Sequence, residues 1–335
     1  MEFGLITMNE QQIMDMYGMD DAVRDVAGVL QSLAAGKVEN PIRTVIEFPE
    51  RSASVLYMPC ADLADGIATN KTVTIFPENP QSNGLPTTQG VVLVTDATDG
   101  RHLALLNASY LTRLRTGAMS GLATDRLARK DASVLCVIGT GGMGYEQVLG
   151  VLAVRDIREI LLVNPTESKA RAFGERLRKE GRVGEDVKLE IVRDVDEAVK
   201  RADIINCATR SETPVFDGEA VRPGTHVNGV GSYLPHMREV DFEFISRCSK
   251  IVADDRHGVV EEAGELIHAD RETDWSFDDL HGELVHLETG QVPGRESKEE
   301  ITFFKCVGAA YYDLAVAKGV YRKAEKEHHG VHVEI

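Results

Sequence analysis

The chain is poor in cysteine and in positive charge. Its five cysteines, at positions 60, 136, 207, 248 and 306 of 335, form no Cys-x-x-Cys pair. Neither a disulfide framework nor a zinc cluster is indicated, and we interpret the cysteines as buried thiols. The 37 lysines and arginines are outnumbered by 54 acidic residues, which gives a formal charge of −17. A nucleic-acid partner, which requires a clustered basic excess, is not expected.

Long apolar runs and a signal sequence are also lacking. No apolar run approaches the roughly 20 residues that span a bilayer, and the opening MEFGLITMNE has neither the basic nor the apolar region of a signal peptide. We expect a cytoplasmic protein with no membrane contact. His328, His329 and His332 lie in the terminal HHGVHVEI without acidic or cysteine ligands at a matching spacing, so we expect a frayed end and no metal site.

The most informative segment is VLCVIGTGGMG, residues 134–144, in which an apolar run leads into a Gly-x-Gly-x-x-Gly turn. Gly139 permits the tight turn, Gly141 permits the backbone to approach a pyrophosphate, and Gly144 permits the next helix to pack closely on the strand. Glycine turns also end strands for purely steric reasons. In its context the turn predicts a dinucleotide at the helix amino terminus.

Short apolar runs follow the turn at intervals, separated by amphipathic segments. Together with the run before the turn they predict a doubly wound parallel sheet of six strands, a Rossmann-type fold of the α/β class. Thr209 follows the fourth strand, at the carboxyl edge where such sheets bind ligands. The runs after the turn are 160–163, 187–192, 202–207, 226–230 and 251–253.

The residues before the glycine turn are numerous enough to form a domain of their own. Their pattern predicts a helix over 8–33, strands over 44–58 and 72–76, a hairpin of 90–95 with 103–106, and a helix over 109–129. An amphipathic segment, 301–318, follows a surface loop at 291–300 and is expected to pack back on this domain. The predicted organisation is a discontinuous α+β domain of residues 1–119 and 309–335, with a dinucleotide-binding domain of residues 120–308.

Three cations of the first domain are candidates for binding a small amino or keto acid, because cations usually hold the carboxylate of such substrates. Lys71 lies at the start of a predicted apolar strand, where a lysine is either a snorkelling edge residue or an active-site cation. Arg115 precedes small residues that permit the close approach of a ligand or another segment, and Arg43 opens a predicted strand. Both arginines can pair with a carboxylate bidentately, although surface ion pairs are the commoner use of such residues.

Three segments together resemble the ornithine cyclodeaminase/μ-crystallin family over nearly the whole chain. They are NKTVTIFPENPQSNGLPTTQGVVLVTDATDGRHLALLNASYLTRLRTGAMSGLA, VIGTGGMG and THVNGVGSYLPHMREVD. The resemblance implies a homodimer whose first domain binds substrate and pairs the subunits, and whose second domain binds NAD(H) or NADP(H). It implies that Lys71 and Arg115 hold the substrate carboxylate, with help from Arg43. The positions that match cofactor contacts are Thr116, Gly141, Gly142, Met143, Thr209, Val230 and Gly308.

One departure from the family pattern bears on the reaction. Cyclodeaminases carry an aspartate in a Gly-Asp-x-Pro pattern where this chain has the segment SYLP, residues 232–235. Tyr233 takes the place of that acid–base group and is expected to donate its hydroxyl to the substrate nitrogen; a packing aromatic is the alternative interpretation. The segment VLYMPC, residues 55–60, also lacks the acidic side chain that binds a distal amine in cyclodeaminases.

The end of the second predicted strand favours NADP(H) over NAD(H). NAD sites usually place Asp or Glu there to bind the ribose hydroxyls, whereas this chain has the uncharged Asn164. Thr166 and Ser168 can donate hydrogen bonds to a 2′-phosphate, and either Lys169 or Arg171 in the next helix can add a cation; a solvated helix residue is the alternative interpretation of Lys169. Pro165 argues the other way, because NADPH-binding relatives often have an arginine there.

The sequence therefore predicts an oxidoreductase that transfers hydride between NAD(P)(H) and the α-carbon of a small amino or imino acid. Lys71, Arg115 and Tyr233 are the expected catalytic residues, and reduction of a cyclic ketimine such as Δ1-pyrroline-2-carboxylate is the first choice of reaction. One alternative is an ornithine or lysine cyclodeaminase, a lyase that uses NAD⁺ catalytically. The other is a μ-crystallin-like protein that binds NADPH and a small ligand.

Overall fold

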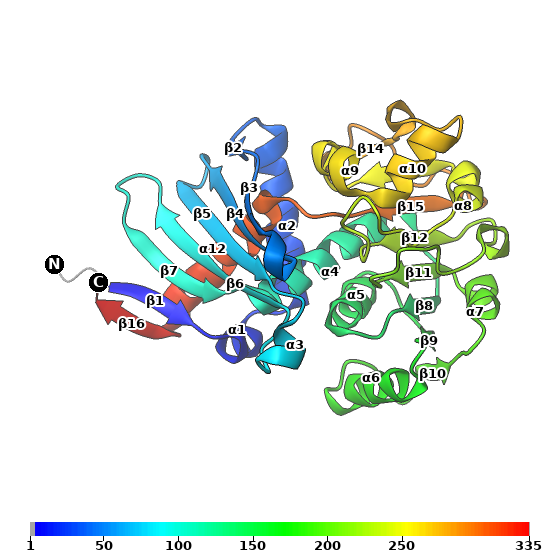
Figure 1. The fold of residues 1–335 in the computed structure, drawn as a ribbon, viewed down its shortest axis with the longest axis horizontal. Coiled ribbons are helices and arrows are strands. Elements are labelled where there is room, and N and C mark those ends of the chain that lie inside the picture. The colour runs from blue at the N-terminus through cyan, green and yellow to red at the C-terminus, as the bar shows by residue number, and fades with distance from the viewer. Residues whose placement is uncertain (1–3, 335) are drawn as a thin grey trace. The chain divides into compact units, whose positions relative to one another are not determined.

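The computed structural model describes residues 4–334 (Figure 1). The chain forms two compact units. Unit 1 contains the residues up to Arg115 together with those from Ala310 onward, and unit 2 contains Thr116–Ala309. The boundary falls inside one helix, α4 (Ala108–Leu127), so Arg115 is the last residue of one unit and Thr116 the first of the other.

Unit 1 is built on a mainly antiparallel sheet of the order β16-β1-β7-β6-β5-β4-β2, with β3 paired to β4. Only the pair of β1 and β7 is parallel. The strands are β1 (Gly4–Met8), β2 (Val38–Glu39), β3 (Thr44–Phe48), β4 (Ala53–Asp62), β5 (Ile67–Ile75), β6 (Thr88–Asp96), β7 (His102–Asn107) and β16 (Val331–Glu334). The helices are α1 (Glu10–Met16), α2 (Met19–Ala34), α3 (Asn79–Ser82) and α12 (Ala310–Glu327).

Helix α12 covers one face of this sheet, where it packs against α2 and strands β4–β7 (Figure 1). The strands turn alternate side chains toward it: Met58, Val92 and Leu106 are buried, and Met58 and Val92 flank Lys71 in the strand register. Each fully buried side chain of this size contributes about 1.5–3 kcal/mol. Lys71 therefore lies on the core face of the sheet, in the middle of β5 rather than at the expected strand start.

Unit 2 contains a fully parallel sheet of the order β10-β9-β8-β11-β12-β15-β13-β14. Alternate residues of β8 and β9 belong to two separate apolar cores, so both faces of the sheet are covered. The predicted doubly wound α/β class is confirmed. The strands are β8 (Val134–Ile138), β9 (Glu159–Val163), β10 (Lys188–Ile191), β11 (Ile204–Cys207), β12 (His226–Gly229), β13 (Lys250–Ala253), β14 (Gly282–Glu283) and β15 (Thr302–Lys305).

Seven helices surround that sheet within the described residues. They are α5 (Gly142–Leu152), α6 (Glu167–Lys179), α7 (Val195–Arg201), α8 (Phe242–Arg247), α9 (Arg256–Glu262), α10 (Gly264–Glu272) and α11 (Leu284–Glu288). The small residues after Arg115 serve helix packing, because a Cβ on Gly150 of α5 would lie 2.0 Å from the Gly117 carbonyl oxygen of α4. Neither α4 nor any other helix within residues 4–334 has the length and apolar character that a bilayer span needs.

Several expected elements are wrong. The expected helix 8–33 is strand β1 followed by α1 and α2, because Asn9 caps α1 and Gly18 is extended at the start of α2. The expected strand 44–58 is interrupted by a 3-10 turn at 49–51, which separates β3 from β4. The sheet of unit 2 has two strands beyond the expected six, β14 and β15.

The last two corrections concern the end of the chain. Segment 301–318 is not one helix, because its first part is strand β15, and a short fully buried strand gives the same apolar run as a buried helix. The terminal segment is not frayed over its described residues, since β16 pairs with β1 and the Thr7 hydroxyl donates to the Val331 carbonyl at 3.2 Å. Residue 335 lies outside the described residues.

Candidate functional site

In unit 1 the two principal cations predicted from sequence meet at one buried carboxylate. Lys71 Nζ lies 2.6 Å from Asp313 Oδ2, and Arg115 Nε lies 3.3 Å from Asp313 Oδ1. The three side chains come from β5, the end of the unit 1 part of α4, and the first turn of α12. All three are at least 93% buried as side chains. We call Lys71, Arg115 and Asp313 the charge cluster.

Burial and neighbouring charges act in opposite directions on Lys71. Burial lowers the pKa of its ammonium group, and the charges of Arg115 and Arg43 lower it further, while Asp313 raises it. Arg43 immediately precedes β3, is partly buried, and is thus close enough to act electrostatically on Lys71. The structure brings all three predicted cations into one electrostatic environment, in which a carboxylate ligand would find two buried donors.

In unit 2 the glycine turn has the geometry that a dinucleotide requires. Gly139 has φ of +100°, a conformation that favours glycine, and a Cβ on Gly144 would lie 2.2 Å from the Gly139 carbonyl oxygen. Among the described residues, no side chain or backbone from another segment lies within 4 Å of the position that a Cβ of Gly141 would take. The turn ends in α5, which begins at Gly142 and Met143, and the first N–H groups of a helix have no partner within it, so they are available to an anion. These residues fit a bound pyrophosphate.

Other predicted cofactor residues follow the carboxyl ends of neighbouring strands. Ile138, Cys207, Gly229 and Lys305 form one row of the parallel register, at the last residues of β8, β11, β12 and β15. The predicted residues after these ends are Gly139, Thr209, Val230 and Gly308. Because the four strands are adjacent, these residues lie at the same edge of the sheet. Ligands bind at this edge in doubly wound folds. Thr116 is buried in α4 of the same unit.

A buried charged network lies directly beneath this edge. Glu239 accepts hydrogen bonds from the Thr209 amide at 2.6 Å, the Thr209 hydroxyl at 2.8 Å and the Gly231 amide at 2.8 Å. Burial raises the pKa of its carboxyl group. Glu265 accepts from Ser232 Oγ at 2.8 Å and pairs with Lys305 Nζ at 3.0 Å. The network fixes the loops that carry Thr209 and Val230.

The segment that replaces the cyclodeaminase aspartate is part of this network through Ser232. The Ser232 side chain is fully buried, and Lys305 Nζ donates to its carbonyl oxygen at 2.6 Å. Tyr233 is partly buried, and its hydroxyl makes no hydrogen bond to the part of the chain that the structure describes. Its role as a donor to substrate stays a prediction.

At the ribose end, Asn164 follows β9 and its side chain accepts a hydrogen bond from the Thr166 amide at 2.9 Å. Thr166 is the residue before α6, and Lys169 is exposed in the first turn of that helix. The structure adds a carboxylate that the sequence analysis did not consider, Glu167, which pairs with Arg171 at 3.0 Å and Arg193 at 2.8 Å. These arginines offset the negative charge of Glu167.

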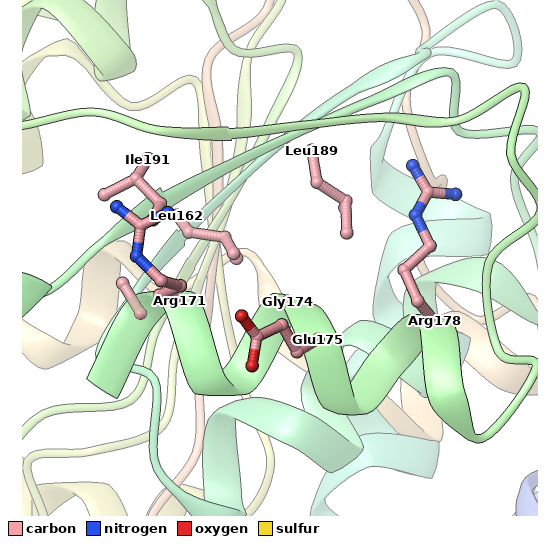
Figure 2. A pocket seen from close by; sticks show the side chains of 8 residues that line it. Leu162, Arg171, Gly174, Glu175, Arg178, Leu189 and Ile191 are labelled. Carbon is pink, nitrogen blue, oxygen red and sulfur yellow. The ribbon is translucent and has the colours of Figure 1, made fainter. Parts of the chain in front are cut away.

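A shallow pocket lies beside α6. Figure 2 shows Leu162, Leu189 and Ile191 pointing toward α6, with Arg171 and Arg178 along the helix. Arg178 is held by backbone carbonyls of the following loop. The pocket is a gap where Gly174 leaves room under the helix, and Arg171, a candidate cation for a 2′-phosphate, lines one part of it.

Asp313, Glu239, Glu265 and Lys305 were not identified from sequence. Lys305 and Asp313 are charges inside apolar segments, TFFKC and AAYYDLAVA, whereas Glu239 lies in the polar segment HMREVD. Charged residues are almost never fully buried unless paired, so a charge within an apolar run is the signal that could have marked Lys305 and Asp313.

Fold and site together define an α/β dinucleotide-binding protein whose unit 1 carries a buried cation pair. The profile of the ornithine cyclodeaminase/mu-crystallin family matches residues 6–328. The chain belongs to this family, and the resemblance inferred from sequence is confirmed.

Individual relatives cover almost the entire chain. A Δ1-pyrroline-2-carboxylate reductase of Bacillus cereus (strain ZK / E33L) is 39% identical over 332 residues, which are 98% of this chain and 99% of that protein. The structure of the Thermococcus litoralis Δ1-pyrroline-2-carboxylate reductase in complex with NADH and L-proline has a TM-score of 0.92 at 33% identity, covering 98% of this chain and 100% of that one. An archaeal alanine dehydrogenase dimer with bound NAD has a TM-score of 0.90 at 32% identity, covering 99% of each chain.

Proposed function

We propose that this protein is an NAD(P)H-dependent reductase of cyclic α-imino acids, with Δ1-pyrroline-2-carboxylate as substrate and proline as product. The reaction joins one imino acid, one NAD(P)H and one proton to give one amino acid and one NAD(P)⁺. The observation that carries the proposal is the buried pair Lys71 and Arg115 in unit 1 of a chain whose unit 2 has a dinucleotide turn. Two relatives that match almost the whole chain, at 39% and 33% identity, are Δ1-pyrroline-2-carboxylate reductases, which supports the same substrate.

The residues of unit 1 bind and orient the substrate. Lys71 and Arg115 donate hydrogen bonds to its carboxylate and neutralise its charge. Arg43, which is partly buried, adds further positive charge nearby. Fixing the carboxylate fixes the adjacent C=N carbon, and positioning of this kind supplies a large share of a rate enhancement. Tyr233 donates its hydroxyl to the substrate nitrogen in this proposal.

The residues of unit 2 hold the cofactor. The N–H groups at 141–143 bind the pyrophosphate, Thr116 and Thr209 contact the cofactor, and Val230 and Gly308 approach its nicotinamide end. When bound, the reduced nicotinamide supplies a hydride to the carbon of the C=N bond. Glu239 keeps Thr209 and the loop after β12 in place for that contact.

The decisive experiment follows cofactor absorbance with purified protein and Δ1-pyrroline-2-carboxylate, beside a parallel ornithine assay for ammonia. We expect cofactor oxidation with the imine and no ammonia from ornithine, because the SYLP segment lacks the cyclodeaminase aspartate. Ammonia release from ornithine without added reductant, with proline as product, would assign the lyase instead. Tight NADPH binding without turnover of any imino or keto acid would assign a binding protein.

For the cofactor, we propose that NADP(H) binds more tightly than NAD(H). Asn164 leaves the ribose end without the usual carboxylate, and Thr166, Lys169 and the two arginines around Glu167 can receive a phosphate. Dissociation constants for NADPH and NADH, measured by fluorescence at the same salt concentration, test this preference. Tighter binding of NADH would refute it.

For the oligomer, we propose a homodimer formed through the outer face of the unit 1 sheet. Tyr57, Val91, Leu105 and Val331 point away from α12 in the strand register and are 37–55% exposed. An apolar sheet face of this kind is typical of an interface, and the archaeal relative is described as a dimer. Sedimentation velocity should give a dimer for the wild type and a monomer for Val91→Lys. Leu63→Lys, at an apolar residue exposed outside the sheet, is the matched control and should stay dimeric.

A further inference from the structure

The carboxylate of Asp313 is the shared partner of both cations that bind substrate in the proposed function. One oxygen faces the Lys71 ammonium group at 2.6 Å and the other faces the Arg115 guanidinium group at 3.3 Å. The Asp313 side chain is 2% exposed. It lies in the first turn of α12, where the helix dipole also favours a negative charge.

Two buried cations this close to one another need an anion between them. Like charges repel strongly where water is excluded, and burial alone already favours the neutral form of Lys71. A carboxylate whose two oxygens face different cations sets the separation of those cations and their orientation. Because α12 packs along β4–β7, the position of Asp313 is in turn fixed by the core of unit 1.

We propose that Asp313 is a positioning residue for carboxylate binding, which holds Lys71 protonated and at a fixed distance from Arg115. It acts through these two residues and does not itself contact substrate. The proposal rests on the proposed function for the identity of the substrate, but the cluster would position any small carboxylate.

The charged and titratable groups near Lys71 come from several different elements. Arg115 faces it from α4 and Arg43 from the segment before β3, and both lower the pKa of Lys71. The Cys60 thiol on β4 stays neutral, because burial, with help from Asp313, raises its pKa to about 12. Asp313 is the group that raises the pKa of Lys71. Its removal should therefore let Lys71 lose its proton at a lower pH.

The test is Asp313→Asn, which keeps the shape and removes the charge. We expect KM for Δ1-pyrroline-2-carboxylate to rise at least about tenfold, and the alkaline limb of kcat/KM to move to lower pH. The dissociation constant for NAD(P)H should stay unchanged, because the dinucleotide residues are in unit 2. Asp313→Glu, which keeps the charge but displaces it by one methylene, should raise KM while leaving the alkaline limb where it is.

The chain offers a matched control on the same helix. Lys318 Nζ of α12 lies 2.9 Å from Asp62 Oδ2 of β4, and both side chains are buried. Asp62→Asn removes one buried carboxylate partner of Lys318, which keeps Asp65 as a second, so it should lower the unfolding midpoint while leaving KM and the pH profile near the wild-type values. Wild-type KM and pH profile in Asp313→Asn, or an equal change in Asp62→Asn, would overturn the proposal.

Two further measurements separate a failure of the proposed reductase function from a failure of the positioning role of Asp313. If the wild type does not reduce the imine, the proposed function fails, and Asp313 is then tested through the binding of pyrrole-2-carboxylate by calorimetry. That affinity should weaken at least about tenfold in Asp313→Asn and not in Asp62→Asn. If Asp313→Asn does not fold, Asp313→Glu decides, and an unchanged KM in that variant contradicts the positioning role.

Discussion

The candidate sites of the two units are built by different physical means. The proposed cofactor site of unit 2 is made largely of backbone, from a glycine turn and strand ends within one continuous segment of chain. Unit 1 presents side-chain charges from three elements, and Lys71 and Asp313 are 242 positions apart in the sequence. The backbone site requires that no side chain fills the space beside the glycine turn. The charge cluster requires that side chains from three elements meet.

The two candidate sites also differ in the free energy that the folded protein needs to maintain them. An open turn costs little to maintain, because its N–H groups stay near solvent until a phosphate arrives. Buried charges carry a desolvation penalty that only good geometry offsets, so removal of one partner is strongly destabilising, by about 3–5 kcal/mol. Variants in unit 1 should therefore lose both activity and stability, and well-chosen variants in unit 2 should lose binding alone.

The largest effect is expected for Lys71→Ala. Loss of the ammonium group leaves the substrate carboxylate with Arg115 alone, and kcat/KM should fall at least about a hundredfold, or roughly 2.7 kcal/mol of barrier. The affinity for NAD(P)H should not change. Lys318→Ala is the control. It breaks a buried ion pair on α12, the helix that carries Asp313, without altering a residue of the charge cluster. A loss of less than about tenfold would make Lys71 a structural residue.

A second pair of variants tests the backbone character of the unit 2 site. Gly141→Ala puts a methyl group into open space, so the unfolding midpoint should hold while the dissociation constant for NAD(P)H rises about tenfold or more. Gly144→Ala puts its Cβ 2.2 Å from the Gly139 carbonyl oxygen and should lower the midpoint as well. Calorimetry and thermal unfolding separate the two effects. Unchanged cofactor affinity in Gly141→Ala would show that the turn does not hold the pyrophosphate.

Unit 2 also contains a buried group that stays neutral, in contrast to the charge cluster. His226 lies between Thr302 and Asn228, at 3.0 and 3.1 Å, and burial lowers its pKa to about 3. The unfolded chain takes up this proton near pH 6.5. The unfolded state therefore binds more protons between these values, and stability should fall as pH drops from 6.5 toward 3, by up to about 1.4 kcal/mol per pH unit.

Urea unfolding at pH 7 and pH 5 measures this dependence. In His226→Gln the difference between the two pH values should shrink, because the amide side chain does not titrate there. An equal difference in wild type and variant would assign the acid sensitivity to other groups.

The smallest effect is expected for Tyr233→Phe. Tyr233 is partly buried, and its proposed hydrogen bond to the substrate nitrogen is one neutral contact, so kcat should fall by about tenfold or less. The pH–rate profiles of wild type and variant should differ if the hydroxyl takes part. Identical profiles and rates would make Tyr233 a packing aromatic.

The same contrast explains which features the sequence could predict. The glycine turn, the parallel sheet and most strands of unit 2 are encoded in short local patterns, and they were predicted. Lys71, Arg115 and Arg43 were candidates by residue type and family resemblance, but Asp313 was missed because its contact with Lys71 is set by the packing of α12. Strand β15 was taken for helix, since a fully buried strand lacks the alternation that identifies exposed strands.

The most direct measurement of the central claim follows the transferred hydrogen. Purified protein is incubated with Δ1-pyrroline-2-carboxylate and NADPH or NADH carrying deuterium at the transferable C4 position, and the products are analysed by NMR. We predict one NAD(P)⁺ per proline, with deuterium at the proline α-carbon. Proline formed from ornithine without net cofactor consumption, or no deuterium at the α-carbon, would contradict hydride transfer to the imine carbon.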